Sequence, residues 1–327
     1  MRFVRRHSML ISAALLAGCA ADRIGGPIRS PGAPLLDRGA AGSDAAFVYT
    51  TIDYPSATTA STTAWGINAR GDIVGDYFDA GGRHGFLLRD GVFSSINVPG
   101  ALTSARGINP AGDIVGTYRM PSEPPVNAHG FLLTRSGELA KVDFPGHINT
   151  IPQRILPDGT ILGCRHDNNT MDSMRGIEMG RRGPSEIDAF ASMNNGATLD
   201  RRRIVGLWTN MMAEGGPRGE GYIIDDGEFT SFVVPGSTST AAWDVNPTGD
   251  IVGVYRTGAG TKLNPFVFHG FVRSGDDYAS VDVPGATATR AFGINARGDV
   301  VGSYVDASGK THGFLARQAR FARADER

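Results

Sequence analysis

Six copies of one short motif recur along the 327-residue chain, and this internal repeat limits its fold more than any other feature. The clearest copy occupies residues 66–75 and reads Gly-Ile-Asn-Ala-Arg-Gly-Asp-Ile-Val-Gly. The other five copies, in order of decreasing similarity, are residues 293–302, 107–116, 244–253, 154–163 and 197–206. In chain order their final glycines are separated by 41, 47, 43, 47 and 49 residues, the length of one supersecondary unit.

Each repeat unit carries four strand-like pieces, which we denote A to D in chain order. Piece A leads into a tight turn containing Gly-Asp, a hairpin signal, and piece B follows, as in residues 72–77. Piece C begins at a glycine–aromatic pair such as Gly85-Phe86, and piece D ends at a proline such as Pro99. Four short strands in ~40–45 residues make one propeller blade. The sequence therefore predicts an all-β, six-bladed β-propeller of four-stranded antiparallel blades.

The B pieces are apolar at two consecutive positions, such as Ile73 and Val74, and this holds in every copy through Val300 and Val301. A strand that is apolar on both sides is buried on both sides, as the middle strands of a blade are between neighbouring blades. The glycine that follows, Gly75 in the first unit, predicts close approach of another backbone because it has no side chain.

The two ends of the repeat region are complementary. Residues 49–55 match piece D, yet no A to C pieces precede them, and the sixth unit stops after its piece C at residues 315–316. We therefore expect the N-terminal strand to complete the last blade, which closes the ring and leaves no exposed end blade. The predicted propeller covers residues 46–318, and residues 319–327 are predicted to be a disordered tail.

The repeat resembles the bacterial HAF extracellular-repeat family, whose units carry Pro-Gly-Ala, Gly-Ile-Asn, Gly-Asp-Ile-Val-Gly and His-Gly-Phe. This chain has those motifs at residues 99–101, 66–68, 71–75 and 84–86. The likeness covers about 270 residues and is strong in units 1, 2, 5 and 6 but weak in units 3 and 4. The resemblance implies export and a repeat architecture, and it implies no shared activity or catalytic residues.

Residues 1–18 are typical of a lipoprotein signal peptide. Three arginines among the first six residues precede an apolar run at residues 9–18, which is far shorter than the ~20 residues of a membrane-spanning helix. Leu-Ala-Gly then precedes Cys19, which resembles the bacterial signal for cleavage before a cysteine whose thiol is acylated. We predict export and lipid anchoring in the cell envelope, and Ala20 favours the outer membrane or cell surface. An ordinary signal peptide that happens to contain a cysteine is the alternative.

Composition limits the partners of the chain. A formal net charge of −1 argues against a basic nucleic-acid-binding surface. Residues 19–45 are rich in Gly, Pro and Ala, which predicts a flexible tether between lipid and domain. With Cys19 acylated, Cys164 has no partner for an internal disulfide. We expect a monomer without cofactor or metal, attached to the membrane through its lipid alone.

Strand direction places the D–A connections and the B–C loops at one face of the propeller, the top, and the A–B and C–D turns at the bottom. Four histidines start piece C in four units: His84, His129, His269 and His312. A ring of histidines is a candidate metal or ligand site. Because one histidine per blade keeps them apart, we favour a structural role in which each imidazole hydrogen-bonds its own blade.

An aromatic residue follows the piece B glycine by two positions in five units: Tyr77, Tyr118, Trp208, Tyr255 and Tyr304. Such rings either stack on sugars or pack between blades. The B–C loops of units 2 to 5 are longer than those of units 1 and 6, so the top face should be tall on one side. The resulting candidate ligand-binding residues are Tyr118, His129, Trp208, Tyr255 and His269.

Other motifs read as structural. The Arg-Gly-Asp tripeptides at residues 70–72 and 297–299 coincide with the A–B turn of the repeat. The carboxylate pairs at residues 225–226 and 276–277 fall in C–D turns, whereas a glycosidase needs two carboxylates that flank a substrate. The sequence thus predicts a non-catalytic binding module for a polysaccharide or another envelope protein. A propeller hydrolase or lyase that acts on an extracellular polysaccharide, and an architectural surface protein without a small ligand, remain the alternatives.

Overall fold

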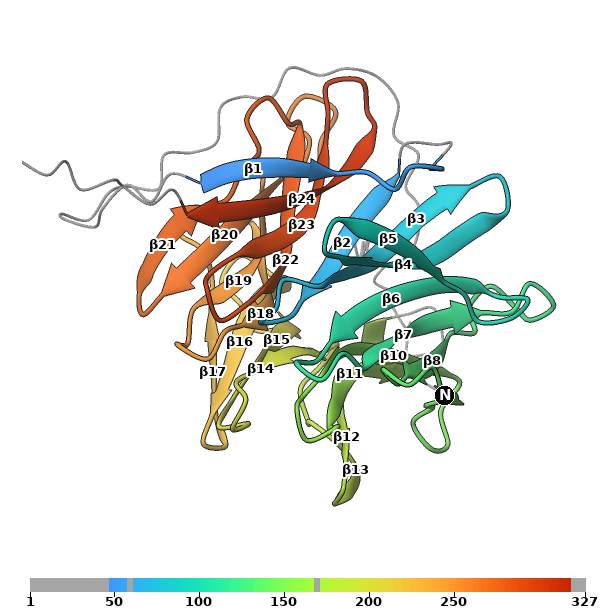
Figure 1. Cartoon of the computed structure of the whole chain (residues 1–327). Helices are drawn as coiled ribbons and strands as arrows, with labels where there is room; N and C mark the ends of the chain where they lie inside the picture. The colour runs from blue at the N-terminus through green and yellow to red at the C-terminus, as the bar shows by residue number, and fades with distance from the viewer. Residues whose placement is uncertain (1–46, 58–60, 168–170, 319–327) are drawn as a thin grey trace, which may run out of the picture.

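The computed structural model describes residues 47–57, 61–167 and 171–318 as six four-stranded antiparallel sheets arranged around one axis (Figure 1). This is the six-bladed β-propeller that the repeat predicted. The predicted signal peptide, Cys19, the tether and the tail lie outside the described residues. Among the described elements, the one helical segment is the 3-10 turn η1 (Met171–Ser173), and no helix is long and apolar enough to cross a membrane.

The blades follow the chain, and strand positions A to D run from the axis outward. Blade 1 contains β2 (Thr62–Ile67), β3 (Ile73–Asp79), β4 (Gly82–Arg89) and β5 (Val92–Ile96). Blade 2 contains β6 (Leu102–Ile108), β7 (Ile114–Arg119), β8 (His129–Leu133) and β9 (Leu139–Lys141). Blade 3 contains β10 (Asn149–Ile155), β11 (Ile161–His166), β12 (Arg175–Gly180) and β13 (Gly183–Glu186). Blade 4 contains β14 (Met193–Ala197), β15 (Arg203–Asn210), β16 (Arg218–Asp225) and β17 (Glu228–Phe232). Blade 5 contains β18 (Ser239–Val245), β19 (Ile251–Thr257), β20 (Val267–Ser274) and β21 (Asp277–Ser280). Blade 6 contains β22 (Ala288–Ile294), β23 (Val300–Val305), β24 (Thr311–Gln318) and β1 (Phe47–Ile52).

The first strand of the chain completes the last blade, as the complementary ends predicted. β1 runs antiparallel to β24, with Phe47 opposite Gln318 and Ile52 opposite Gly313, and the two strands lie side by side in Figure 1. Ile52 is buried in a cluster with Ile73 of blade 1, so the closing strand also packs against the neighbouring blade. The ring therefore closes through both a backbone ladder and an apolar contact.

The glycine of every B strand lies where a side chain would collide with the neighbouring A strand. A Cβ atom built on Gly75 would sit 2.0 Å from the carbonyl oxygen of Thr63 and 2.6 Å from the ring of Phe86. Phe86 is the residue directly opposite Gly75 on β4. The same close approach recurs at Gly116, Gly163, Gly206, Gly253 and Gly302. The predicted approach of another backbone is confirmed, and it explains why glycine and the Gly-aromatic pair recur together.

The fourth unit differs from the alignment that the sequence suggested. The window at 197–206 placed Ala197 at the position of Gly66, but the register places Gly196 there. Gly66 is opposite Val74, and Gly196 is opposite Val205 in the same bulged arrangement. The A–B turn of blade 4 is one residue longer than that of blade 1, and Arg201 within it has a positive φ of 60°. Because of this extra turn residue, an alignment without gaps starts one residue too late, and the unit keeps too few repeat residues to reveal the error.

Candidate functional site

Each innermost strand contains a β-bulge at the same position, and the bulged residues lie near the axis. The register shifts by one residue between Ala64 and Gly66 in β2, and at the matching point in the other five A strands. A bulge re-aims one side chain out of the regular alternation. The six bulged residues are 0 to 7% exposed, and we call them the axial residues: Trp65, Arg106, Gln153, Asn195, Trp243 and Phe292.

Aromatic rings fill one half of this axial layer. The ring centroids of Trp65 and Phe292 are 4.2 Å apart, and those of Trp243 and Phe292 are 4.9 Å apart. The guanidinium of Arg106 lies 3.9 Å from the Trp65 ring in a cation–π contact. Blades 5, 6 and 1 thus supply aromatic groups, and blades 2 to 4 supply polar ones. The motif by itself did not indicate these residues, although each one directly precedes the first motif position, which the register places at Gly196 in blade 4.

A buried ion pair crosses the axial region beside this layer. Arg154 and Asp244 occupy, in blades 3 and 5, the position that is glycine in the other four blades, and their Nε and Oδ2 atoms are 3.1 Å apart. Arg154 also donates from Nη1 to the Arg106 carbonyl at 3.1 Å and from Nη2 to the Phe292 carbonyl. Asp244 accepts from the Ile294 amide at 3.1 Å. Burial raises the pKa of Asp244, and Arg154 opposes that shift. The pair connects blades 2, 3, 5 and 6.

At the upper end of each seam between neighbouring blades, beside the axis, three residue positions meet. They are the residue after the B-strand glycine, the residue two before the C-strand glycine, and the residue two before the axial residue of the next blade. At the seam of blades 1 and 2, the Asp76 carboxylate accepts from Ser104 at 2.5 Å and from the Trp65 indole at 2.9 Å. Arg83 is ion-paired with the same carboxylate, with Nη2 and Oδ2 3.1 Å apart. We call the residues at these three positions the seam residues.

The seam residues divide the top of the axis into two unlike halves. Three seams are closed by buried groups that are apolar apart from Thr117: Thr117, Ala128, Ile151; Cys164, Met174, Met193; and Leu207, Gly219, Ala241. The next seam adds Val254 and Phe268, with the Arg290 guanidinium 4.2 Å from the Phe268 ring. We call the remaining group the polar crescent, which spans blades 6, 1 and 2 and consists of Arg290, Ser303, Thr311, Thr63, Asp76, Arg83 and Ser104.

The four top-face histidines are each bonded within their own blade, as the favoured structural interpretation expected. His129 lies between Asp143 and Glu123, at 2.8 Å from each carboxylate. The other three histidines also bond through Nδ1 to a residue just after strand D of their own blade, at 2.7 to 2.9 Å. These pairs are His84 with Asn97, His269 with Asp282, and His312 with Asp53. Within the described residues, no three His, Cys, Asp or Glu side chains are grouped to hold a metal ion. The histidines therefore act as cross-links between strands C and D.

The predicted ligand-binding residues do not converge on one point. Tyr118 packs on His129 in blade 2, and Tyr255 stacks on His269 in blade 5, with ring centroids 5.1 and 5.0 Å apart. Trp208 of blade 4 makes an edge contact with Phe229. Tyr255 and His269 are 1 and 5% exposed, so they offer no ring face to a ligand. For Tyr118, His129 and Trp208, which are half-buried, a ligand-binding role stays a prediction.

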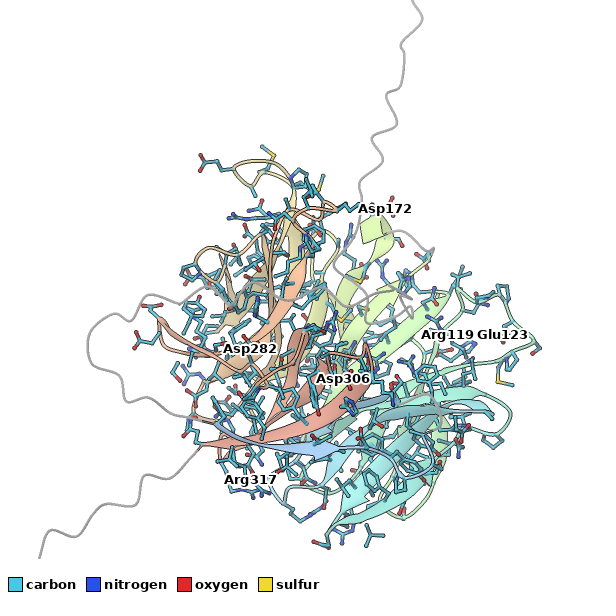
Figure 2. All side chains as sticks on the ribbon, turned by 90° about the horizontal axis from the view of Figure 1, so that it is seen from above. Arg119, Glu123, Asp172, Asp282, Asp306 and Arg317 are labelled. Carbon is cyan, nitrogen blue, oxygen red and sulfur yellow. The ribbon has the colours of Figure 1, made fainter. Side chains whose placement is uncertain are left out.

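The B–C connections make the top face uneven. In blade 1 only two residues separate β3 from β4, whereas residues 211–217 and 258–266 connect the B and C strands of blades 4 and 5. Met212 and Leu263, in these two long loops, are 91 and 99% exposed. Figure 2 shows Arg119, the last residue of β7, and Glu123, in the long connection that follows it, towards the edge of the molecule. The predicted difference in loop height is present.

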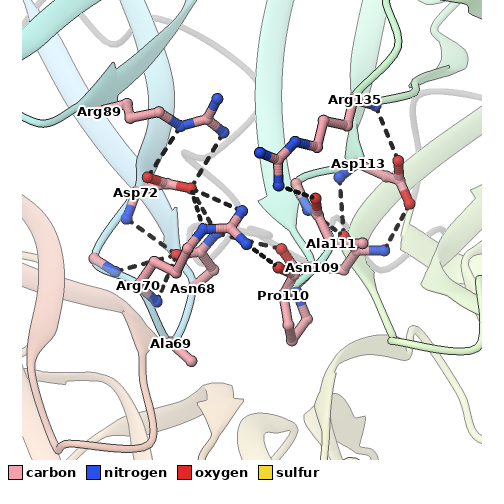
Figure 3. A network of polar contacts seen from close by, with 12 residues as sticks. Asn68, Ala69, Arg70, Asp72, Arg89, Asn109, Pro110, Ala111, Asp113 and Arg135 are labelled. Atoms are coloured by element: carbon pink, nitrogen blue, oxygen red, sulfur yellow. Dashed lines mark hydrogen bonds and ion pairs between the residues drawn. The ribbon is translucent and has the colours of Figure 1, made fainter.

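The bottom face is held by the repeat's own turn residues (Figure 3). The Asn68 side chain accepts from the amides of Arg70, Gly71 and Asp72, and its Nδ2 donates to Asp72 at 2.9 Å. Arg70 bonds Asp72 and donates to the Pro110 carbonyl of the next blade at 2.5 Å. Although burial opposes ionisation, the arginine and asparagine hydrogen bonds hold the pKa of Asp72 below its ordinary value. The Arg-Gly-Asp residues are thus engaged in the turn.

A hollow of about 360 Å³ opens on the bottom face between blades 4 and 5. Two arginines of its lining are paired with carboxylates: Arg203 bonds Asp225 at 2.5 Å, and Arg273 bonds Asp276 at 2.9 Å. One carboxylate of each predicted pair, Asp226 or Asp276, lies in a C–D turn, whereas Asp225 ends β16 and Asp277 begins β21. This hollow lies at the opposite face from the polar crescent and the long loops.

Comparison with known proteins identifies no family for this chain. No family model and no curated protein matches the chain. Similar solved structures include TolB from Acinetobacter baumannii, at 14% identity and TM-score 0.44, covering 80% of this chain and 55% of that one. A gluconolactonase from Xanthomonas campestris has 13% identity and TM-score 0.48, covering 80 and 87%. The β-propeller domain of the Trilobed protease from Pyrococcus furiosus has 12% identity and TM-score 0.45, covering 82 and 85%. The chain spans about half the length of the TolB chain, and identities this low transfer no activity.

Proposed function

We propose that this protein is a non-catalytic binding module of the bacterial cell envelope, exported and held at the membrane by a lipid on Cys19. The observation that carries the binding role is the pair of long top-face loops on blades 4 and 5. Exposed apolar side chains on loops set on a rigid scaffold are typical of interaction surfaces. Met212 and Leu263 are almost fully exposed in these loops, while the ring beneath them is closed by strand ladders.

The chemistry of the top face favours binding over catalysis. Its four histidines recur from blade to blade and bond within their own blades, as His129 does with Asp143 and Glu123. Although burial opposes ionisation, hydrogen bonds from Lys141 and His129 hold the pKa of Asp143 below its ordinary value. A catalytic acid or base works best with a pKa near the operating pH. Side chains repeated and paired in this way serve as strand cross-links.

A direct test is binding of the mature chain without its lipid, residues 20–327, to an array of envelope polysaccharides and cell-wall fragments. We expect binding that Met212→Ser combined with Leu263→Ser weakens at least tenfold, because the substitutions remove the exposed apolar contacts. The matched control is Val48→Ser combined with Val92→Ser, which changes two side chains of 61 and 65% exposure on outer strands. Equal loss in both variants would contradict the assigned surface, and release of shortened oligosaccharides would contradict a non-catalytic role.

The anchoring part of the proposal has a separate test. Changing Cys19 to Ser removes the thiol that would carry the lipid, so we expect the protein to move from the detergent phase to the aqueous phase in a detergent-partitioning assay. Cys164→Ser is the control, because that thiol is buried in the apolar seam of blades 3 and 4. Unchanged partitioning of the Cys19→Ser protein would rule out lipid attachment at this residue.

A further inference from the structure

The charged side chains around the axis are mainly basic. Four arginines and two aspartates occupy the axial positions, the seam positions and the motif's first position: Arg83, Arg106, Arg154, Arg290, Asp76 and Asp244. Arginines thus outnumber aspartates at these positions, in a chain whose formal net charge is −1. Charge held among low-dielectric walls produces a stronger potential than the same charge in water. The top of the axis should therefore attract anions.

The basic groups reach solvent on one side of the axis only. Arg83 and Arg290 are half-buried, as are Thr63 and Thr311, whereas the seam residues of blades 3 and 4, such as Met193, are buried. The accessible part of the polar crescent is therefore Arg83, Arg290, Thr63 and Thr311, and its other three residues are buried. The polar crescent begins beside the Phe268 ring and ends at the seam of blades 1 and 2.

The guanidiniums of Arg83 and Arg290 are each held by a neighbouring ring. Arg290 lies over Phe268 at 4.2 Å, and Arg83 lies over Phe78 at 5.4 Å while it pairs with Asp76. Stacking restrains a guanidinium, whose planar fork matches the two oxygens of a carboxylate. Restrained groups lose less conformational entropy when a ligand binds than mobile surface arginines do.

Hydroxyl groups occupy the seam between these two arginines. Thr63 of β2 and Thr311 of β24 lie where blades 1 and 6 meet, and Ser61 bridges directly to Thr311. Ser303, opposite Arg290 in the ladder, is buried beside this seam and offers no hydroxyl to a ligand. Hydroxyls both donate and accept, which suits the hydroxyl groups of a sugar. Two cationic groups, two hydroxyls and an adjacent phenyl ring form a small set of polar groups beside an apolar one, the usual makeup of a specific ligand site.

We propose that the polar crescent binds the carboxylate of an acidic sugar, with Arg290 and Arg83 as the anion-binding groups and the hydroxyl seam as the sugar-binding part. The inference rests on the proposed binding function and names its ligand class, an oligosaccharide that contains uronic acid. The long loops of blades 4 and 5 stand on the other side of the axis and would contact the rest of the chain of sugars.

The test compares oligomers of galacturonic acid with neutral galactose oligomers of the same length, by calorimetric titration of residues 20–327. We expect the acidic oligomer to bind at least tenfold more tightly, and the difference to shrink as salt is raised, because screening weakens the charge contribution. Arg83→Gln combined with Arg290→Gln should abolish the difference by lowering the affinity for the acidic oligomer at least tenfold. Arg135→Gln combined with Arg317→Gln removes two exposed arginines outside the crescent and should change nothing.

Three outcomes separate this inference from the proposed function. Equal affinity for acidic and neutral oligomers, or acidic binding that survives loss of both arginines, overturns the inference while the binding function stands. Failure to bind any sugar, acidic or neutral, on the wider array overturns the polysaccharide function itself. If Arg83→Gln unfolds the ring by leaving Asp76 unpaired, Arg290→Gln with Arg83→Lys keeps the test: loss of tenfold selectivity supports the site, and retained selectivity refutes it.

Discussion

A chain that begins at residue 55 is expected to lose half or more of its free energy of unfolding. Removing residues 47–54 deletes β1, and with it six ladder positions opposite β24 and the buried side chain of Ile52. Burial of one such side chain stabilises by ~1.5–3 kcal/mol, and the stacked pair of Tyr54 and Tyr77, 3.6 Å apart, adds ~0.5–1.5 kcal/mol. Domains have only ~5–15 kcal/mol in total.

The measurement is thermal unfolding, where we expect the midpoint to fall by about 10 °C or more. A chain that begins at residue 46 is the control and should melt like the mature protein. Because β24 would be left as an unpaired edge, a synthetic peptide of residues 46–56 should restore part of the loss when added in excess. An unchanged melting midpoint after the deletion would mean that β1 does not close the ring.

Replacing Arg154 by Gly, the residue of four other blades, is expected to destabilise the protein by ~3–5 kcal/mol despite its agreement with the repeat. The reason is that Asp244 would keep a buried carboxylate without its counter-charge. Asp244→Gly should be similarly costly, because it leaves the buried guanidinium of Arg154. The double change to Gly removes both charges, and we expect it to cost less than the sum of the single changes in denaturant unfolding.

The same substitution predicts how the stability difference between variant and parent changes with pH. Burial already raises the pKa of Asp244, and loss of Arg154 removes the group that opposes the shift. The native variant then holds a proton that the unfolded chain releases, so the variant gains stability relative to the parent as pH falls from 8 towards 5. A stability difference that stays constant over this range, or a double variant that loses the full sum, would mean that the two side chains do not act as a pair.

The six-bladed ring and the strand that closes it were both predictable from the sequence. Gly75 and Phe86 recur because they face each other on neighbouring strands, and a glycine–aromatic contact that is present in five of the six blades leaves a periodic signal. Closure was predictable because Ile52 lies in a D-like segment and the sixth unit has none. Repetition multiplies local signals, which is why the architecture was accessible from a single chain.

The axial region was not predictable in the same way, because its contacts join positions where the repeat varies. Arg154 and Asp244 read as two unrelated departures from the motif, and only the ring brings them together. The polar crescent consists of residues from three different blades. The counterparts of its two arginines, Arg290 and Arg83, in blades 3 to 5 are not polar. The opposite charges at one motif position were the available clue. The features that the blades share build the scaffold.

The pairing of Phe47 with Gln318 has a consequence for orientation. These two residues are the first and last of the described strands, and both lie at the C–D end of blade 6, on the bottom face. Any segment attached before the one or after the other therefore leaves from a single corner of the disc. A molecule attached through either of these residues is held at the bottom edge of blade 6. Its top face, with the polar crescent and the long loops, then points away from the point of attachment.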